Sequence, residues 1–356
     1  METAVREASL EARIKHWGRE IGFDAVAIAG TELAEEEARL MEWLGRGWHG
    51  GMDYMARHGA RRARPAELVP GTVSIITVRL NYEPGEARAT REVLDDAQSA
   101  FVSRYALGRD YHKVLRAKLQ KLADRMTSEI GAFHYRVFTD SAPVMEVALA
   151  RRAGLGWRGK HTLTLSRDAG SMFFLGELFV SLDLARDEAT TAHCGSCNRC
   201  LEACPTNAIV APYQVDARRC VSYLTIEHHG AIPEELRSLM GNRIYGCDDC
   251  QLVCPWNKYA KVAAEPDFAV RNALDDAALV DLFAWSAGEF DRRFEGSAIR
   301  RIGHERWLRN IAVALGNAPT TPAVVAALES RRDDPSPLVR EHVEWALARH
   351  ARRAAA

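Results

Sequence analysis

All eight cysteines of this sequence lie within one segment, and they are its clearest candidates for chemistry. Cys194, Cys197, Cys200 and Cys204 follow the spacing C-x2-C-x2-C-x3-C-P. In the bacterial pattern for two [4Fe–4S] clusters, the first three thiolates bind one cubane and the fourth binds the other. Clustered cysteines in a protein of a reducing compartment are metal ligands more often than disulfides. The spacing therefore predicts iron–sulfur clusters and electron transfer.

The other four cysteines complete a second cluster. Cys247, Cys250 and Cys254 repeat the motif with one cysteine fewer, and Cys220 is the only cysteine left. Because each cubane takes four ligands, Cys220 completes the set by elimination. The crossover pattern gives Cys194, Cys197, Cys200 and Cys254 to cluster one, and Cys204, Cys220, Cys247 and Cys250 to cluster two. A zinc site is the alternative, but zinc favours two C-x2-C pairs separated by a longer gap.

The segment before the cysteines has a mixed pattern of helices and strands. Apolar residues at helical spacing predict helices, and β-rich runs bounded by turn residues predict strands. The predicted helices cover 5–21, 32–46, 111–130 and 142–153, and the predicted strands cover Phe23–Ala29, Val73–Asn81, Phe133–Phe138 and Met172–Val180. We therefore expect an α/β (α+β) domain in front of the cysteines.

The rest of the chain divides into two further parts. The cysteine-rich segment has four prolines and few regular runs, so its metal rather than a large apolar core would hold it together. Beyond it the pattern becomes helical, with predicted helices over 308–317, 321–330 and 336–349. Short helices with short breaks are typical of HEAT or armadillo arrays, of which one or two units are visible.

Composition narrows the class of protein. The chain has 356 residues, a net charge of −1 and 47% hydrophobic residues, which suggests two or three folded domains. Its balanced charge excludes a chain coated with basic residues, although a local basic patch remains open. The most apolar stretch, Ser171–Val180, is interrupted by Glu177 and is too short to span a membrane. With no signal peptide or twin-arginine leader visible, we expect a cytoplasmic protein.

Two clusters alone would make a small electron carrier, but long segments precede and follow them here. No G-x-G-x-x-G follows a strand and no G-x-x-x-x-G-K-[ST] is present, which argues against a bound dinucleotide or ATP. A non-enzymatic electron-transfer protein is one hypothesis. We favour a second one, in which the clusters feed electrons to another site in the same chain.

Several motifs outside the first cysteine run resemble the epoxyqueuosine reductase family. They are Ser103–Lys113 (SRYALGRDYHK), Thr139–Pro143 (TDSAP), Ala153–Lys160 (AGLGWRGK), Gly170–Glu177 (GSMFFLGE), Cys220–Glu227 (CVSYLTIE), Ile299–Ile302 (IRRI), Leu308–Asn310 (LRN) and Leu315–Asn317 (LGN). With both cysteine motifs, the resemblance runs through nearly the whole chain. The set is specific, whereas no single motif is.

This resemblance implies an architecture and a reaction. The implied parts are a cobalamin-binding nitroreductase-like domain over 1–188, a ferredoxin-like 2[4Fe–4S] domain over 189–262, and an all-α HEAT-like tRNA-binding domain over 263–356. Enzymes of this family reduce epoxyqueuosine to queuosine at the wobble position of tRNA, losing the epoxide oxygen as water, with cobalamin reduced through the clusters. The implied partners are that tRNA and an external low-potential electron donor, and the implied state is a monomer without membrane contact.

Asp140 lies in the TDSAP motif and matches the family's catalytic aspartate, so it is the candidate proton donor. Loss of an epoxide oxygen as water requires protons, and a carboxyl with a raised pKa in a water-poor pocket suits that task. The alternative is that Asp140 caps a helix that begins at Ala142, a common role for Asp ahead of a proline. Both roles can hold together.

The resemblance also implies contacts for the cofactor and the tRNA. Those for cobalamin are Arg62, Ser103, Asp140, Lys160, Thr162, Thr164, Ser171, Ser222 and Asp248, and those for tRNA are Arg292, Arg293, Arg300, Arg301 and Arg309. The tRNA set lies in a locally basic stretch of a nearly neutral chain, which favours phosphate. The structural alternatives are a solvated helix face for the arginines, packing for Ser103, and hydrogen bonds to the cluster loops for Ser222 and Asp248.

A corrinoid iron–sulfur reductive dehalogenase is the alternative enzyme, because it shares the cofactor arrangement. Such enzymes usually carry an export leader, and the helical C-terminal part has no obvious use with a small halide substrate.

Overall fold

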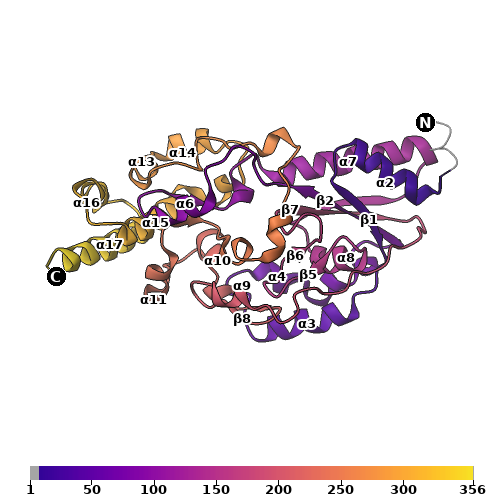
Figure 1. Cartoon of the computed structure of the whole chain (residues 1–356), viewed down its shortest axis with the longest axis horizontal. Coiled ribbons are helices and arrows are strands. Elements are labelled where there is room, and N and C mark those ends of the chain that lie inside the picture. The colour runs from indigo at the N-terminus through magenta and orange to yellow at the C-terminus, as the bar shows by residue number, and fades with distance from the viewer. Residues whose placement is uncertain (1–7, 356) are drawn as a thin grey trace.

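The computed structural model describes residues 8–355 and contains one four-stranded sheet with helices around it (Figure 1). The strands are β1 (Ala25–Ala29), β2 (Ser74–Asn81), β4 (Tyr135–Thr139) and β7 (Phe173–Val180), in the order β1-β2-β7-β4. All neighbours are antiparallel. Each strand lies within two residues of its predicted limits, so the expected mixture of α and β structure is confirmed.

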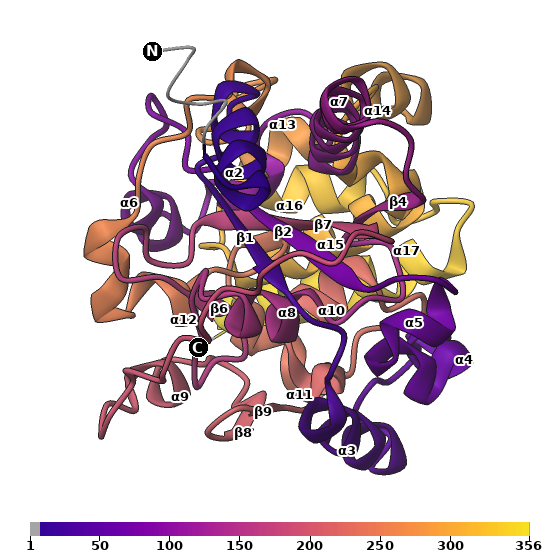
Figure 2. The same cartoon turned by 90° about the vertical axis from the view of Figure 1, so that its right-hand side faces the viewer.

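Helices cover both faces of this sheet (Figure 2). On one face lie α2 (Leu10–Glu20) and α7 (Tyr111–Ile130), and on the other lies α8 (Glu146–Arg152). The helix predicted over 5–21 is α2, and residues 5–7 lie outside the described residues. The other helices of this part are α3 (Ala34–Gly45), α4 (Asp53–His58), α5 (Pro65–Leu68) and α6 (Thr90–Asp95).

The helix after Asp140 begins later than predicted. The backbone first makes a tight turn, in which the N–H of Ala142 donates to the carbonyl of Thr139 over 2.8 Å. The N-cap of α8 is Met145, so the helix starts at Glu146. The alternative role of Asp140 as a helix cap is therefore wrong, and its carboxylate is free for other partners.

The cysteine-rich segment consists of short elements tied to the sheet-bearing part. Its β10 (Arg243–Tyr245) pairs in parallel with β3 (Phe101–Val102). Beside this pair, the side-chain amide of Asn242 donates to three backbone carbonyls. One belongs to Val93 in α6, and the other two belong to Asp96 and Ser99 just after that helix. The other short elements of the segment are α9 (Arg199–Glu202), β8 (Ile209–Ala211), β9 (Gln214–Val215), α10 (Val221–Ile226), α11 (Glu234–Arg237) and α12 (Asp249–Leu252). The short strands β5 (Trp157–Arg158) and β6 (Thr164–Leu165) lie before it, in the sheet-bearing part.

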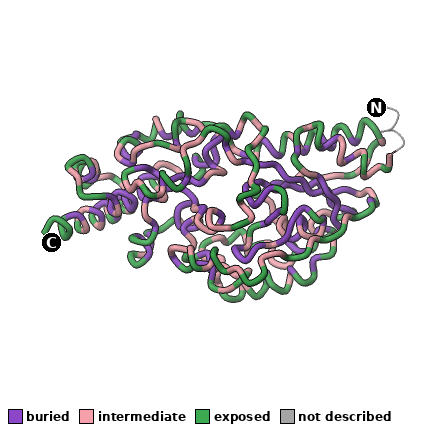
Figure 3. The backbone as a smooth tube through the Cα atoms, viewed as in Figure 1, coloured by how far each residue is buried: buried purple, intermediate pink, exposed green. Residues whose placement is uncertain are grey.

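The C-terminal part is helical, as predicted. Its helices are α13 (Leu279–Phe283), α14 (Ala287–Arg293), α15 (Gly303–Asn317), α16 (Pro322–Glu329) and α17 (Pro337–Ala355). The middle of α15 is buried from all sides (Figure 3). Ile311 of α15 and Val343 of α17 belong to one apolar cluster with Val102 of β3 and Ile226 of α10. One apolar core therefore extends from the C-terminal helices into the sheet-bearing part and the cysteine-rich segment. Among residues 8–355, no helix has the length and apolar content that a membrane span requires.

Candidate functional site

Four of the cysteines line a cavity of about 460 Å³ between the sheet and the cysteine-rich segment. They are Cys204, Cys220, Cys247 and Cys250, the predicted ligands of cluster two. The same cavity is lined by Asp140 at the end of β4, Tyr111 at the start of α7, and Phe174 of β7. The fold therefore places one predicted cluster site and the Asp140 carboxylate, whose side chain is 51% exposed, on the wall of one open cavity.

Burial raises the pKa values of several cysteine thiols, and neighbouring thiols add to this effect. Burial raises the pKa of Cys200 to about 11, and Cys254, Cys194 and Cys197 raise it further. Burial also raises the pKa values of Cys220, Cys247 and Cys250, with Cys204 acting on two of them. Cys200 acts on Cys250 as well, so these shifts do not divide the thiols into two separate sets, and the crossover assignment of ligands stays a prediction.

Asp140 is held as a carboxylate by two neighbours. Tyr111 donates its phenol O–H to Oδ2, and His112 Nε2 lies 3.6 Å from the same oxygen. Burial by itself would raise the pKa of Asp140, but these two partners hold it below its usual value. The raised pKa expected from the sequence is therefore wrong, because His112 lies beside the carboxylate and Tyr111 donates to it.

His112 supplies that positive charge. Burial lowers the pKa of His112, but its contacts with Asp110 and Asp140 raise it overall to about 9, so the imidazole is protonated at neutral pH. The neighbouring Tyr111 ring stacks on Phe174 with centroids 4.0 Å apart, which aims its O–H at Asp140. Tyr111 and His112 lie in one of the family motifs, but the sequence alone did not indicate their role. The feature that could have indicated it is the triplet Asp-Tyr-His at the start of a helix.

The structure brings together seven of the nine residues predicted to contact cobalamin. They are Ser103, Asp140, Thr162, Thr164, Ser171, Ser222 and Asp248, which all line the 460 Å³ cavity. Lys160 lines neither this cavity nor its neighbour. Its ammonium donates to the carbonyl of Cys197 and to Asn198 Oδ1, each over 3.0 Å. The charge of Lys160 thus holds the loop of cluster one, and its contact with cobalamin stays a prediction.

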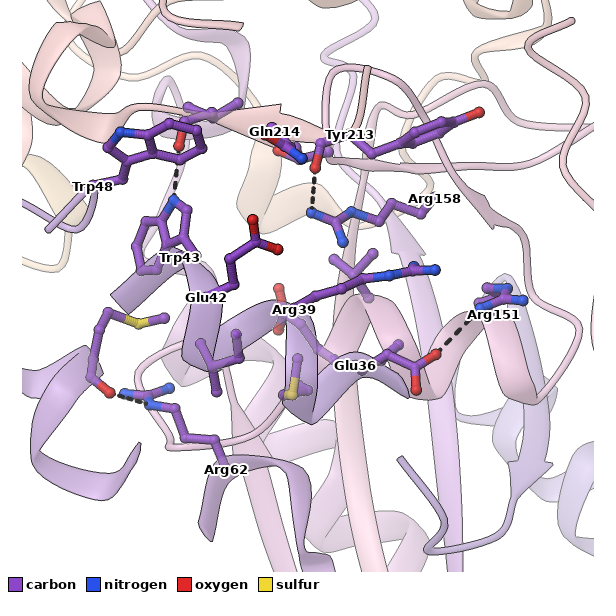
Figure 4. Close-up of a pocket in the computed structure, with 18 of the residues that line it drawn as sticks. Glu36, Arg39, Glu42, Trp43, Trp48, Arg62, Arg151, Arg158, Tyr213 and Gln214 are labelled. Carbon is purple, nitrogen blue, oxygen red and sulfur yellow. Dashed lines mark hydrogen bonds and ion pairs between the residues drawn. The ribbon is translucent and has the colours of Figure 1, made fainter. Parts of the chain in front are cut away.

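Arg62 lines a second, larger cavity of about 850 Å³ (Figure 4). It is only 6% exposed, and it donates to the carbonyls of Tyr54 and Met55. The two cavities share the lining residues Glu146, Val147, Thr162 and Val215, so they adjoin. A ligand larger than either cavity could extend from one into the other.

Two polar atoms in the wall of the smaller cavity lack partners. Thr164 Oγ1 and His161 Nε2 are buried, and neither has a hydrogen-bond partner among residues 8–355. Buried polar atoms are costly when unpaired, and they commonly mark the place of a ligand or water. Asp248, in contrast, is satisfied by the Ser103 hydroxyl at 2.5 Å and the Arg104 N–H at 2.9 Å.

The five arginines predicted to contact tRNA separate into exposed and buried ones. Arg292, Arg293, Arg300 and Arg301 are exposed. Arg301 also reaches the 460 Å³ cavity, where it pairs with Glu227 over 2.5 Å. Arg309 is 0% exposed, so the prediction that it contacts tRNA is wrong. Its guanidinium instead binds backbone carbonyls of the cysteine-rich segment, those of Leu224, His228 and Gly230.

Replacing Arg309 with methionine is expected to destabilise the fold by about 3 kcal/mol or more, because it leaves several buried carbonyls unpaired. Chemical denaturation measures this loss. The matched control is Arg293→Ala, an exposed arginine whose loss should change stability by less than about 0.5 kcal/mol. Equal stability of Arg309→Met and the wild type would contradict the buried network.

Comparison with known proteins identifies relatives over almost the full chain. Residues 62–141 match the family model described as "Epoxyqueuosine reductase QueG, DUF1730", and residues 193–257 match "4Fe-4S double cluster binding domain". An epoxyqueuosine reductase of Burkholderia pseudomallei is 60% identical, covering 96% of this chain and 92% of the relative. A crystal structure of an epoxyqueuosine reductase with an epoxyqueuosine-modified tRNA stem loop is 28% identical, with a TM-score of 0.87 over 97% of this chain and 91% of that one.

A second solved structure bears on the cavity. It is an epoxyqueuosine reductase from Bacillus subtilis, 28% identical, with a TM-score of 0.86 over 97% of this chain and 91% of that one. It is described as having its aspartate catalytic loop swung out of the active site.

Proposed function

The chain belongs to the epoxyqueuosine reductase family, and from this premise we propose that it reduces epoxyqueuosine to queuosine in tRNA with cobalamin bound in the two adjoining cavities. The observation that carries this proposal is the position of Asp140, which lines the same cavity as the predicted ligands of cluster two. A proton donor and a source of electrons are therefore proposed to serve one site.

The residues present fit a corrinoid. The adjoining cavities offer room for a large ring with an appendage, and Thr164 and His161 offer unpaired polar atoms to its amide groups. We propose that Ser103, Thr162, Thr164, Ser171, Ser222 and Asp248 surround the ring, and that Arg62 lies beside the appendage. When bound, cobalamin supplies a reduced metal centre that accepts electrons from the clusters and acts on the epoxide-bearing ring.

The chain's own residues supply the proton chemistry. The net reaction takes up two electrons and two protons, releases water and leaves an alkene. We assign Asp140 as the group that delivers a proton to the epoxide oxygen. His112 and Tyr111 hold the Asp140 carboxyl in place, and closure of the cavity by bound ligands would raise the pKa of Asp140 towards the range that donation requires.

We also propose the finer organisation implied by the sequence. The parts are a nitroreductase-like domain over 1–188, a ferredoxin-like domain with two [4Fe–4S] clusters over 189–262, and a HEAT-like tRNA-binding domain over 263–356. Cluster one, whose predicted ligands do not line the cavity of Asp140, would receive electrons from an external low-potential donor. We expect a cytoplasmic monomer.

A double replacement of Arg293 and Arg300 by alanine is expected to weaken tRNA binding and to lower its salt dependence, because exposed arginines release counterions when they meet phosphates. The slope of log affinity against log salt should fall by about 1 for each lost phosphate contact. Binding of an anticodon stem loop at several salt concentrations measures this. Arg332→Ala on α16, an exposed arginine paired with Glu329, is the matched control. Equal slopes for the double variant and the control would contradict this surface.

The proposal is tested by presenting the reconstituted protein with two substrates under the same reducing conditions. One is a stem loop that carries epoxyqueuosine, and the other is a small aryl halide. We expect turnover of the stem loop alone. Release of halide without any change in the stem loop would contradict the proposed function.

A further inference from the structure

Two carboxyl groups, those of Asp140 and Glu146, line the cavity, and a third, that of Glu177, is buried in β7, a strand that also lines it; the proposed function uses only Asp140. Glu177 occupies the centre of β7, where its neighbours across the sheet are Thr77 of β2 and Phe138 of β4. Side chains alternate along a strand, and Phe179 of β7 lies in the core under α8, so Glu177 points to the same face. Glu146 is the first residue of α8 on that face.

Glu177 is buried without any partner. Its side chain is 0% exposed, and neither carboxyl oxygen has a hydrogen-bond partner among the described residues. The Thr77 hydroxyl beside it in the sheet is also unpartnered. A carboxylate in such a place is costly, so the group holds a proton instead. Burial, followed by the negative charge of Asp140, raises the pKa of Glu177 to about 8.

Glu146 connects the buried acid to the cavity. It lines both cavities, and the charges of Asp140 and Glu177 both act on it. Burial, assisted by those two charges, raises the pKa of Glu146 well above its usual value. At neutral pH the set therefore holds Asp140 as a carboxylate and both glutamates as carboxylic acids.

Charged groups on the surrounding elements are engaged elsewhere. On β2, Arg79 lies on the same face but pairs with Asp168 and with the Ser166 hydroxyl. The two arginines of α8 pair with Glu36. At the level of Glu177, β1 contributes Ala27 and β4 contributes Phe138. Arg136 lies on the same face of β4 but is exposed, with its guanidinium 5.2 Å from the centre of the Phe138 ring. The remaining ionisable neighbours of Glu177 within the described chain are thus Glu146 and Asp140.

We propose that Glu146 and Glu177 store the protons that recharge Asp140 during turnover, an inference that rests on the proposed function. Asp140 is a carboxylate at rest, so the Glu146 O–H bond breaks first as a new O–H bond forms on Asp140, and Asp140 then gives this proton to the epoxide oxygen. Glu177 restores the proton of Glu146, and a second passage through Asp140 delivers the second proton. No electrons move in these transfers. The two stored protons equal the two that the reaction consumes, and both glutamates regain protons from solvent through the cavity after product leaves.

Replacing Glu146 with glutamine tests the route during turnover. We expect kcat to fall by about 100-fold with little change in KM for tRNA, since proton delivery fails while binding is intact. Glu177→Gln should lower kcat by about tenfold and remove the decline of wild-type kcat as pH rises through about 8. Glu146→Asp and added formic acid should each restore part of the Glu146→Gln loss. Glu265→Gln, a carboxylate that pairs with Lys118 and lines neither cavity, is the control.

Thermal melting of the cluster-loaded protein gives a readout that needs no turnover. Glu177 has a folded pKa above the ordinary value of 4.5, so the folded state keeps a proton that the unfolded chain releases between pH 4.5 and about 8. Wild-type stability therefore falls as pH rises through that window, and glutamine lacks this dependence. We expect Glu177→Gln and wild type to melt together at pH 5, and the variant to melt higher at pH 8.5.

The outcomes separate this inference from the proposed function. If wild type converts its substrate and Glu146→Gln is equally fast at every pH, the proton store is wrong while the function stands. An identical Tm difference between Glu177→Gln and wild type at pH 5 and pH 8.5 also overturns the store, without reference to activity. If wild type does not convert the substrate, the function fails and the store fails with it.

Discussion

The Asp140→Asn protein is expected to fold, bind both clusters and cobalamin, and turn over about 10²–10⁴ times more slowly than wild type. Asparagine keeps the shape of the side chain but cannot donate a carboxylic proton. The Tyr111 hydroxyl can still donate to the remaining oxygen, so the cavity should keep its form. The loss should therefore appear in kcat rather than in KM for tRNA.

Single-turnover assays on modified tRNA measure this effect, with iron and cobalt content determined on the same samples. Glu265→Gln is a suitable control, since it changes a carboxylate that lines neither cavity. The pKa of His112 offers a second readout. Asp140 helps to raise that pKa to about 9, so the asparagine variant should titrate His112 at lower pH. Wild-type turnover in Asp140→Asn would remove Asp140 from the mechanism.

Replacing Cys220 with alanine is expected to remove cluster two alone and to abolish turnover. Cys220 is the one cysteine outside both motifs, and its thiol lines the cavity with Cys204, Cys247 and Cys250. A cubane that loses one of four thiolates at a buried site is not retained. Because the route from the donor to the cavity is then broken, electrons should not reach the substrate.

Iron content and electron paramagnetic resonance test this expectation. The variant should contain about four irons per chain, half of the eight expected for two cubanes. Cys194→Ala is the matched comparison, since it should lose cluster one and leave the cavity wall intact. Full iron content in Cys220→Ala would contradict the assignment of ligands.

The sequence was informative where chemistry depends on local spacing. The cysteine run specifies its own ligand pattern within a few residues, and the strands of the sheet follow from local alternation and turn residues. The position of α8 was less accessible, because Pro143 and the apolar run after it are compatible with a helix from Ala142. The hydrogen-bonded turn from Thr139 to Ala142 decides the matter, and it delays the helix by four residues.

Tertiary contacts explain what the sequence did not predict. Arg309 and Arg301 look alike in a basic stretch, yet α15 turns Arg309 inward onto backbone carbonyls, whereas Arg301 lies in the turn before α15 and reaches the cavity. Lys160 matches a cofactor motif, but the fold places its ammonium on the loop of cluster one. The pKa of Asp140 depends on His112, which comes from a different element. Such pairings join residues that are distant in sequence or turned by helical packing, so no local pattern reports them.

The most direct test of the account is anaerobic conversion of tRNA that carries epoxyqueuosine. The protein is reconstituted with iron, sulfide and cobalamin, supplied with a low-potential reductant, and the digested nucleosides are weighed by mass spectrometry. The account predicts loss of one oxygen atom only when cobalamin is present. An unchanged nucleoside mass, with both clusters and cobalamin confirmed in the protein, would contradict it.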